Sequence, residues 1–124
     1  MRSERNNSQI ETLSRNNPII SIGLDNFQKE VLEENSPVLV LCMYRDAEFQ
    51  KQIDVIESTC VSYVGRLKVC LIEEGFIGAF RENLDVKGTP TFMLFTNGTE
   101  KGRLLGQTEQ KTLEDFLSRT MSID

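Results

Sequence analysis

Two apolar segments constrain the fold of this 124-residue chain more than any other feature. The first is Pro37-Val38-Leu39-Val40-Leu41-Cys42-Met43, and the second runs from Leu67 to Ile72. Strands with one face in water alternate apolar and polar residues, whereas these segments are almost continuously apolar. Such runs are typical of central strands that are buried on both faces. The sequence therefore predicts a sheet with helices on both sides.

The remaining patterns alternate between helix and strand. Ile19–Ile22 predicts a short first strand. Asp25 is the expected N-cap of a short helix, because Gln28 follows three residues later. A longer helix is expected from about Ala47 to Val64, because one helical stripe there is apolar: Phe49, Ile53, Ile56, Cys60 and Val64.

The second half of the chain predicts a short helix, a hairpin and a closing helix. The helix covers Gly75–Asn83, and Thr91–Phe95 is the first strand of the hairpin. Asn97-Gly98 is a two-residue turn of the kind that joins antiparallel strands. Leu113, Phe116 and Leu117 mark the closing helix. This order predicts an α/β protein whose mixed central β-sheet is flanked by helices on both faces.

Composition narrows the possible partners. Asp and Glu number 19 against 14 Lys and Arg, and the pI is about 4.8. An acidic surface repels nucleic acid and anionic lipid, so we expect neither as a partner. The chain has no histidine, the commonest general base and a common zinc ligand. We therefore expect no metal and no cofactor.

Domain organisation follows from the same patterns. Residues 1–18 are polar and predict a flexible extension, residues 19–119 form the expected domain, and residues 120–124 form a short C-terminal tail. No stretch approaches the roughly 20 apolar residues that span a bilayer. The first residues lack the apolar core of a signal peptide, so we expect a cytoplasmic protein.

The segment Lys87-Gly88-Thr89-Pro90-Thr91, followed by an apolar strand and Asn97-Gly98, resembles thioredoxin around its cis-proline. The resemblance covers residues 19–119. It implies the thioredoxin fold, a cis bond between Thr89 and Pro90, and a groove in which the backbone before the proline pairs with an extended peptide. Gly106 matches the small residue that forms the floor of this groove.

The same resemblance shows which chemistry is missing. Ala47 and Gln50 occupy the positions of the two redox cysteines, and Asp46 replaces the tryptophan before them. Dithiol exchange requires an attacking thiolate and a resolving thiol, which these side chains cannot supply. Leu41 and Leu71 replace the buried aspartate and lysine of the family. Loss of both charges together is physically consistent, since one alone would be an unpaired buried charge.

The three cysteines, Cys42, Cys60 and Cys70, fall at expected core positions and act there as small apolar residues. The resemblance implies that Cys42 and Cys70 are staggered by about two residues on neighbouring strands, too far apart for a disulfide. A reactive thiol among the three stays an open alternative. It would make the chain a divergent thiol-disulfide oxidoreductase or an electron-transfer protein.

The favoured interpretation is a redox-inactive thioredoxin-like protein with a chaperone-like or assembly role. It would bind an extended segment of a partner protein and exist as a monomer or weak homo-oligomer. No catalytic residue is expected, and Glu48 near a helix N-terminus is stabilised there by the helix dipole. Phe49 either forms an exposed rim of the groove or packs beneath it against Ile53. The expected groove residues are Asp46, Ala47, Glu48, Phe49, Thr89, Pro90 and Gly106.

Overall fold

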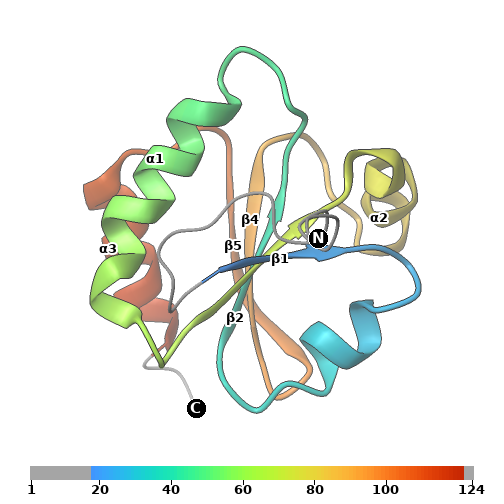
Figure 1. The fold of residues 1–124 in the computed structure, drawn as a ribbon, viewed down its shortest axis with the longest axis horizontal. Coiled ribbons are helices and arrows are strands. Elements are labelled where there is room, and N and C mark those ends of the chain that lie inside the picture. Colours follow the sequence, from blue (N-terminus) through green and yellow to red (C-terminus); the bar gives the residue numbers. More distant parts are fainter. Residues whose placement is uncertain (1–17, 122–124) are drawn as a thin grey trace, which may run out of the picture.

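The computed structural model describes residues 18–121, so most of the polar N-terminal extension and the last three residues lie outside the described part. Its centre is a five-stranded sheet in the order β1-β3-β2-β4-β5 (Figure 1). Strands β1, β3 and β2 are parallel, and β4 and β5 are antiparallel to their neighbours. This confirms the predicted mixed sheet. The strands are β1 (Ile19–Ile22), β2 (Val38–Cys42), β3 (Lys68–Ile72), β4 (Thr91–Thr96) and β5 (Thr99–Leu105).

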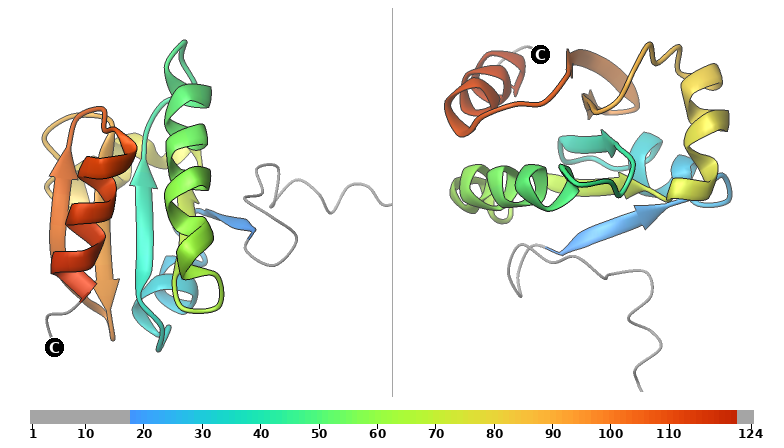
Figure 2. Two further views of the ribbon diagram at one scale, coloured as in Figure 1. Left: turned by 90° about the vertical axis from the view of Figure 1, so that its left-hand side faces the viewer. Right: turned by 90° about the horizontal axis from the view of Figure 1, so that it is seen from above.

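Helices cover both faces of the sheet, as predicted (Figure 2). Helices α1 (Phe49–Cys60) and α3 (Gln110–Met121) lie side by side on one face. Helix α2 (Ile77–Asn83) and a short π-helix (Gln28–Leu32) pack on the other face. Short 3-10 turns cover Val61–Tyr63 and Glu74–Phe76.

The sheet separates two cores. One lies between the sheet and helices α1 and α3, and is called the α1/α3 core; the other lies beneath α2 and the π-helix, and is called the α2 core. Leu39 and Leu41 point into the first, whereas Val38, Val40 and Cys42 point into the second. Successive strand residues face opposite sides, and every residue of β2 is buried. The apolar run therefore reflects a central strand with two apolar faces.

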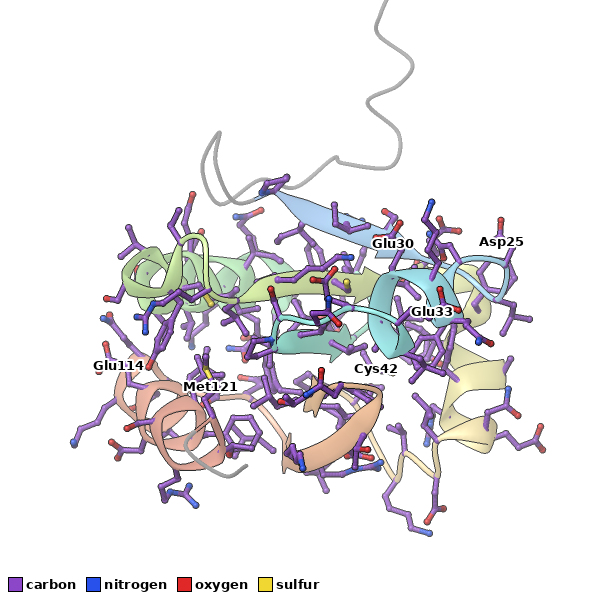
Figure 3. All side chains as sticks on the ribbon, turned by 90° about the horizontal axis from the view of Figure 1, so that it is seen from below. Asp25, Glu30, Glu33, Cys42, Glu114 and Met121 are labelled. Atoms are coloured by element: carbon purple, nitrogen blue, oxygen red, sulfur yellow. The ribbon has the colours of Figure 1, made fainter. Side chains whose placement is uncertain are left out.

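Two predicted helix ends are wrong. Asp25 does not cap the short helix; instead the side chain of Asn26 accepts a hydrogen bond from the Gly23 N–H (2.8 Å) and donates one to the Ser21 carbonyl (3.0 Å). These bonds tie the loop to the end of β1, so the regular helical turns begin only at Gln28. Figure 3 shows the Asp25 side chain at the periphery.

The second error concerns Val64, which was expected on the buried stripe of α1. The helix ends at Cys60, and Val64 is extended and 38% exposed. The carbonyl of Tyr63 accepts hydrogen bonds from the N–H groups of both Arg66 and Leu67, and Gly65 has a positive φ of 83°. The chain therefore turns toward β3 directly after Tyr63.

The β4–β5 hairpin has the predicted two-residue turn. Asn97 and Gly98 have φ values of 51° and 80°, the left-handed conformation that such a turn requires. A Cβ atom on Gly98 would lie 2.8 Å from the carbonyl oxygen of Leu32. Glycine is needed here both for its backbone conformation and for the close approach of the π-helix.

Candidate functional site

Three loops meet at the end of the sheet where β2 finishes. Cys42 at the end of β2 pairs with Thr91 at the start of β4, and Thr91 pairs with Leu105 at the end of β5. The residues that follow β2, precede β4 and follow β5 are therefore neighbours. They bring together five of the seven predicted groove residues around one pocket: Asp46, Glu48, Phe49, Thr89 and Pro90.

The pocket has a volume of about 80 Å³. Met43, Phe49 and Pro90 provide apolar walls, while Asp46 and Glu48 are the charged residues that line it. Tyr44, Gln52 and Gln107 complete the lining among the described residues, together with Thr89. Ala47 and Gly106, both predicted for the groove, are not part of this lining.

One side of the pocket is a wall of backbone from residues 88–90. The Thr89–Pro90 peptide bond is cis. The Thr91 hydroxyl donates a 2.6 Å hydrogen bond to the Gly88 carbonyl, and the Gly106 N–H donates a 2.8 Å bond to the Pro90 carbonyl. The backbone N–H and C=O of Thr89 make no hydrogen bond to residues 18–121, and the residue is only half-buried. This leaves one main-chain donor and one acceptor open beside the pocket.

The opposite side is the loop from β2 into α1 together with the first turn of that helix, and is called the α1 wall. The Asp46 carboxylate accepts a hydrogen bond from the Glu48 N–H (3.0 Å), and the Asp46 carbonyl accepts one from the Phe49 N–H (3.1 Å). These bonds begin the first turn of α1. Ala47 is exposed. Gln50 is exposed as well, and its amide donates a 3.0 Å hydrogen bond to Asp54 one turn further along the helix.

Phe49 takes the second of its two predicted positions. Its side chain is 8% exposed and belongs to the α1/α3 core, together with Ile53. The guanidinium carbon of Arg45 lies 4.6 Å from the centre of the Phe49 ring, within the range of a cation–π contact. Phe49 is therefore a buried wall of the pocket and not an exposed anchor on its rim.

Gln52 was not among the predicted groove residues, yet it ties the α1 side of the site to the segment after β5. Its side chain is 2% exposed and lines the pocket. The Gln52 amide donates to the Thr108 carbonyl (3.2 Å) and its oxygen accepts from the Thr108 N–H (2.9 Å). These two bonds fix the segment after β5 against α1. A signal was present in the sequence, because Gln52 lies three residues after Phe49, on the buried stripe.

The two leucines in place of the family's buried charges face each other. Leu41 and Leu71 are partners in the β2–β3 register, and both belong to the α1/α3 core. Leu41 is 0% exposed and Leu71 is 2% exposed. The core beneath the α1 wall is therefore closed by two apolar side chains that are neighbours across the strands.

All three cysteines are free and buried, and none lines the pocket. Burial raises the pKa of Cys42, a shift that Arg81 partly opposes. Burial also raises the pKa of Cys60 and that of Cys70 to about 12. Cys42 (Figure 3) and Cys70 point into the α2 core, and Cys60 lies across the sheet in the α1/α3 core. The register pairs Cys70 with Val40, which confirms the two-residue stagger from Cys42.

Fold and site together define a single-sheet α/β protein with a small pocket beside a proline loop. The family model for thioredoxin matches residues 18–119. The chain is also 30% identical over 106 residues to a thioredoxin of Pseudomonas aeruginosa, an alignment that covers 80% of this chain and 93% of that protein. The chain belongs to the thioredoxin family. Within residues 18–121, no helix is long and apolar enough to cross a membrane.

Proposed function

We propose that this chain is a redox-inactive member of the thioredoxin family that binds an extended segment of a partner protein in the groove beside Thr89. The observation that carries the proposal is the combination of an open groove with the absence of any thiol in its lining among the described residues. The groove keeps the parts needed for binding, and the parts needed for disulfide exchange have been replaced. Such binding suits a chaperone-like or assembly role.

The chemistry of the α1 wall supports the first half of this proposal. Thiol–disulfide exchange begins with attack by a thiolate on an accessible disulfide sulfur. The attacking position holds the methyl group of Ala47, and the resolving position holds the amide of Gln50, which is engaged with Asp54. The remaining thiols are enclosed in the two cores, where their raised pKa disfavours the thiolate.

The backbone of the opposite wall supports the second half. An unpaired main-chain donor and acceptor next to a side-chain pocket is the arrangement used in β-augmentation, in which backbone bonds supply affinity and the pocket supplies selectivity. Thr89 offers both groups, and the pocket opens directly beside it. An extended peptide would satisfy both features at once.

Disulfide reductase activity tests the redox half. The protein should not accelerate the reduction of insulin by dithiothreitol, whereas a Cys-containing thioredoxin assayed beside it should. Acceleration by the wild-type chain would overturn this half of the proposal and favour the divergent thiol oxidoreductase. A variant with Cys42, Cys60 and Cys70 replaced by alanine would then identify whether one of these thiols is responsible.

Capture of partners from a lysate tests the binding half, with Gly106→Arg as the blocking variant. Gly106 has a φ of 99°, and a Cβ there would meet nothing within 4 Å, so the new side chain extends into open space beside Pro90. Gly65→Arg is the matched control, because Gly65 has a φ of 83°, equally open surroundings and a position beyond the far end of α1. Partners that elute with salt should be lost with Gly106→Arg and kept with Gly65→Arg. Equal capture by both variants would contradict binding in the groove.

A further inference from the structure

The lining of the pocket restricts the side chain that a bound segment can place in it. A cavity of about 150 Å³ lined by apolar side chains holds a benzene ring. The pocket here measures about 80 Å³ and has Met43, Phe49 and Pro90 as apolar walls. That space can enclose a branched aliphatic side chain, whereas an aromatic ring would extend out of it.

The charged residues of the pocket restrict what lies next to that side chain. Asp46 and Glu48 both line the pocket, and no lysine or arginine does so among residues 18–121. The neighbouring Glu74 carboxylate adds a third acidic group, since it accepts a 2.9 Å hydrogen bond from the Arg45 N–H. Of the nearby cations, Arg45 stacks on Phe49 and Lys87 pairs with Asp85 at 3.0 Å. Arg45 keeps its positive charge in that contact and offsets one of the three carboxylates, so the mouth of the pocket presents an excess of negative charge to a ligand.

Two exposed apolar side chains flank the same opening. Tyr44 is 37% exposed and lines the pocket, and Leu105 is 60% exposed at the end of β5. A methyl carbon of Leu105 would lie 3.7 Å from a Cβ on Gly88, which places its side chain against the backbone wall. Tyr44 in the pocket lining and Leu105 beside Gly88 therefore offer exposed apolar contact area near Thr89.

We propose that the groove selects an extended segment with one aliphatic residue for the pocket and a lysine or arginine two residues before or after it. Residues two apart in a strand lie on the same face, so the basic side chain would face Asp46 and Glu48 while the aliphatic side chain enters the pocket. This inference rests on the proposed peptide-binding function and specifies its ligand. It adds a charge and a size requirement that net composition alone does not provide.

A display library of random nine-residue segments tests the pattern with the full chain as bait. Sequences enriched on wild type and on Gly65→Arg, but not on Gly106→Arg, are the groove binders. They should carry Val, Ile or Leu with Lys or Arg two positions away. Groove binders without a basic preference, or with aromatic residues at the central position, would overturn this inference and leave the proposed function intact. No difference between wild type and Gly106→Arg would overturn both.

Charge-neutral variants then test the acidic residues themselves. One selected segment is synthesised in two forms, with its lysine kept or replaced by glutamine. Wild type should bind the lysine form about fivefold more tightly at low salt, the scale expected for one or two partly exposed ion pairs. The preference should fall to near unity in Asp46→Asn/Glu48→Gln, because both negative charges are removed. The asparagine side chain can still accept the hydrogen bond from the Glu48 N–H, so the start of α1 is kept.

The matched control removes the same charge elsewhere. Glu57 and Glu82 are exposed on α1 and α2 and do not line this pocket. Glu57→Gln/Glu82→Gln should keep the fivefold preference for the lysine form, on the same ion-pair scale. Equal loss of preference in both double variants would mean that overall net charge, and not the pair at the pocket, determines selectivity, and the inference would fail.

Discussion

The two walls of the groove differ in which residues of the thioredoxin pattern they keep. The wall of residues 88–90 keeps the family sequence, a cis bond at Pro90 and a Thr89 backbone that makes no hydrogen bond to residues 18–121. The wall at the start of α1 has Ala47 and Gln50 at the positions where the resemblance places the dithiol. The proposed binding depends on the backbone of the first wall, whereas dithiol exchange would depend on the side chains of the second. A chain can therefore lose one capacity without disturbing the other.

The difference extends into the core behind the α1 wall. Leu41 and Leu71 face each other across β2 and β3 and are almost completely buried. Two charges at these positions would need each other, because a single buried charge without a partner is costly. Their joint replacement by leucine indicates that the α1 wall is now built for packing.

The largest expected effect comes from returning one charge to that core. Leu41→Asp should lower the free energy of unfolding by about 3–5 kcal/mol at pH 7, the cost of an uncompensated buried charge. Urea denaturation would measure the loss. Leu105→Asp, at a 60% exposed position, should change stability by less than about 0.5 kcal/mol.

The double variant Leu41→Asp/Leu71→Lys sharpens the same test. Because the two positions are register partners, its loss should be smaller than the sum of the two single losses. If Leu41→Asp alone were as stable as wild type, the core would have room and polar partners for a carboxylate. The contrast between the two walls would then not extend below the surface.

Residue patterns predicted the strands and the proline loop well. They failed at helix ends that are determined by contacts with other parts of the chain. Val38–Cys42 is a strand buried on both faces because its own residues are apolar, and Asn97-Gly98 turns because of local backbone preference. The start of the π-helix depends instead on the bonds from Asn26 to Ser21 and Gly23. The end of α1 before Val64 depends on the turn that leads into β3.

The site shows the same limit. The sequence placed most groove residues in one region, because the loops that carry them follow from the predicted sheet. It left the position of Phe49 open, since burial depends on α3 and the sheet as well as on Ile53. It also missed Gln52, whose partner Thr108 lies 56 residues away.

Thiol reactivity gives the second prediction. A pKa of about 12 for Cys60 and Cys70, against an ordinary value of 9.0, lowers the thiolate fraction at pH 8 by about a thousandfold. Iodoacetamide should therefore modify these two thiols of the native wild-type protein about a thousandfold more slowly than in urea, as followed by mass spectrometry. Fast modification of one native thiol would break the comparison, because redox chemistry would survive at a new position.

Ala47→Cys provides the matched positive control. Residue 47 is exposed just before α1, where a thiolate is accessible and stabilised by the helix N-terminus. This variant should incorporate one equivalent of iodoacetamide rapidly in the native state. If the introduced thiol failed to react, the loop would shield residue 47. Slow labelling of the native cysteines would then not distinguish buried thiols from a position that should be accessible.

The hydrogen bonds that join the α1 wall to the segment after β5 give a smaller effect. Gln52→Met keeps the side-chain length but leaves the buried N–H and C=O of Thr108 unpaired. We expect a loss of about 2 kcal/mol in unfolding free energy, and a further loss of binding for the groove-selected peptides because Gln107 is no longer fixed. Isothermal titration calorimetry, at a temperature where wild type and Gln52→Met are both fully folded, measures the loss of peptide affinity separately from the loss of stability. Unchanged peptide affinity would show that Gln52 supports stability alone.

The smallest effect is expected at the other end of the sheet, far from both walls. The Ser36 N–H and Lys68 hydrogen-bond the Glu34 carboxylate and lower its pKa below the ordinary value of 4.5. A carboxylate with a lowered folded-state pKa stabilises the protein above its unfolded pKa, and this stability is lost as pH falls through the folded value. Glu34→Gln should therefore cost at most about 1 kcal/mol at pH 7 and almost nothing near pH 3, by urea denaturation at each pH. Peptide affinity should stay unchanged, the reverse of the pattern expected for the groove variants. A binding defect in Glu34→Gln would mean that charge far from the groove influences peptide affinity. The two walls alone would then not account for binding.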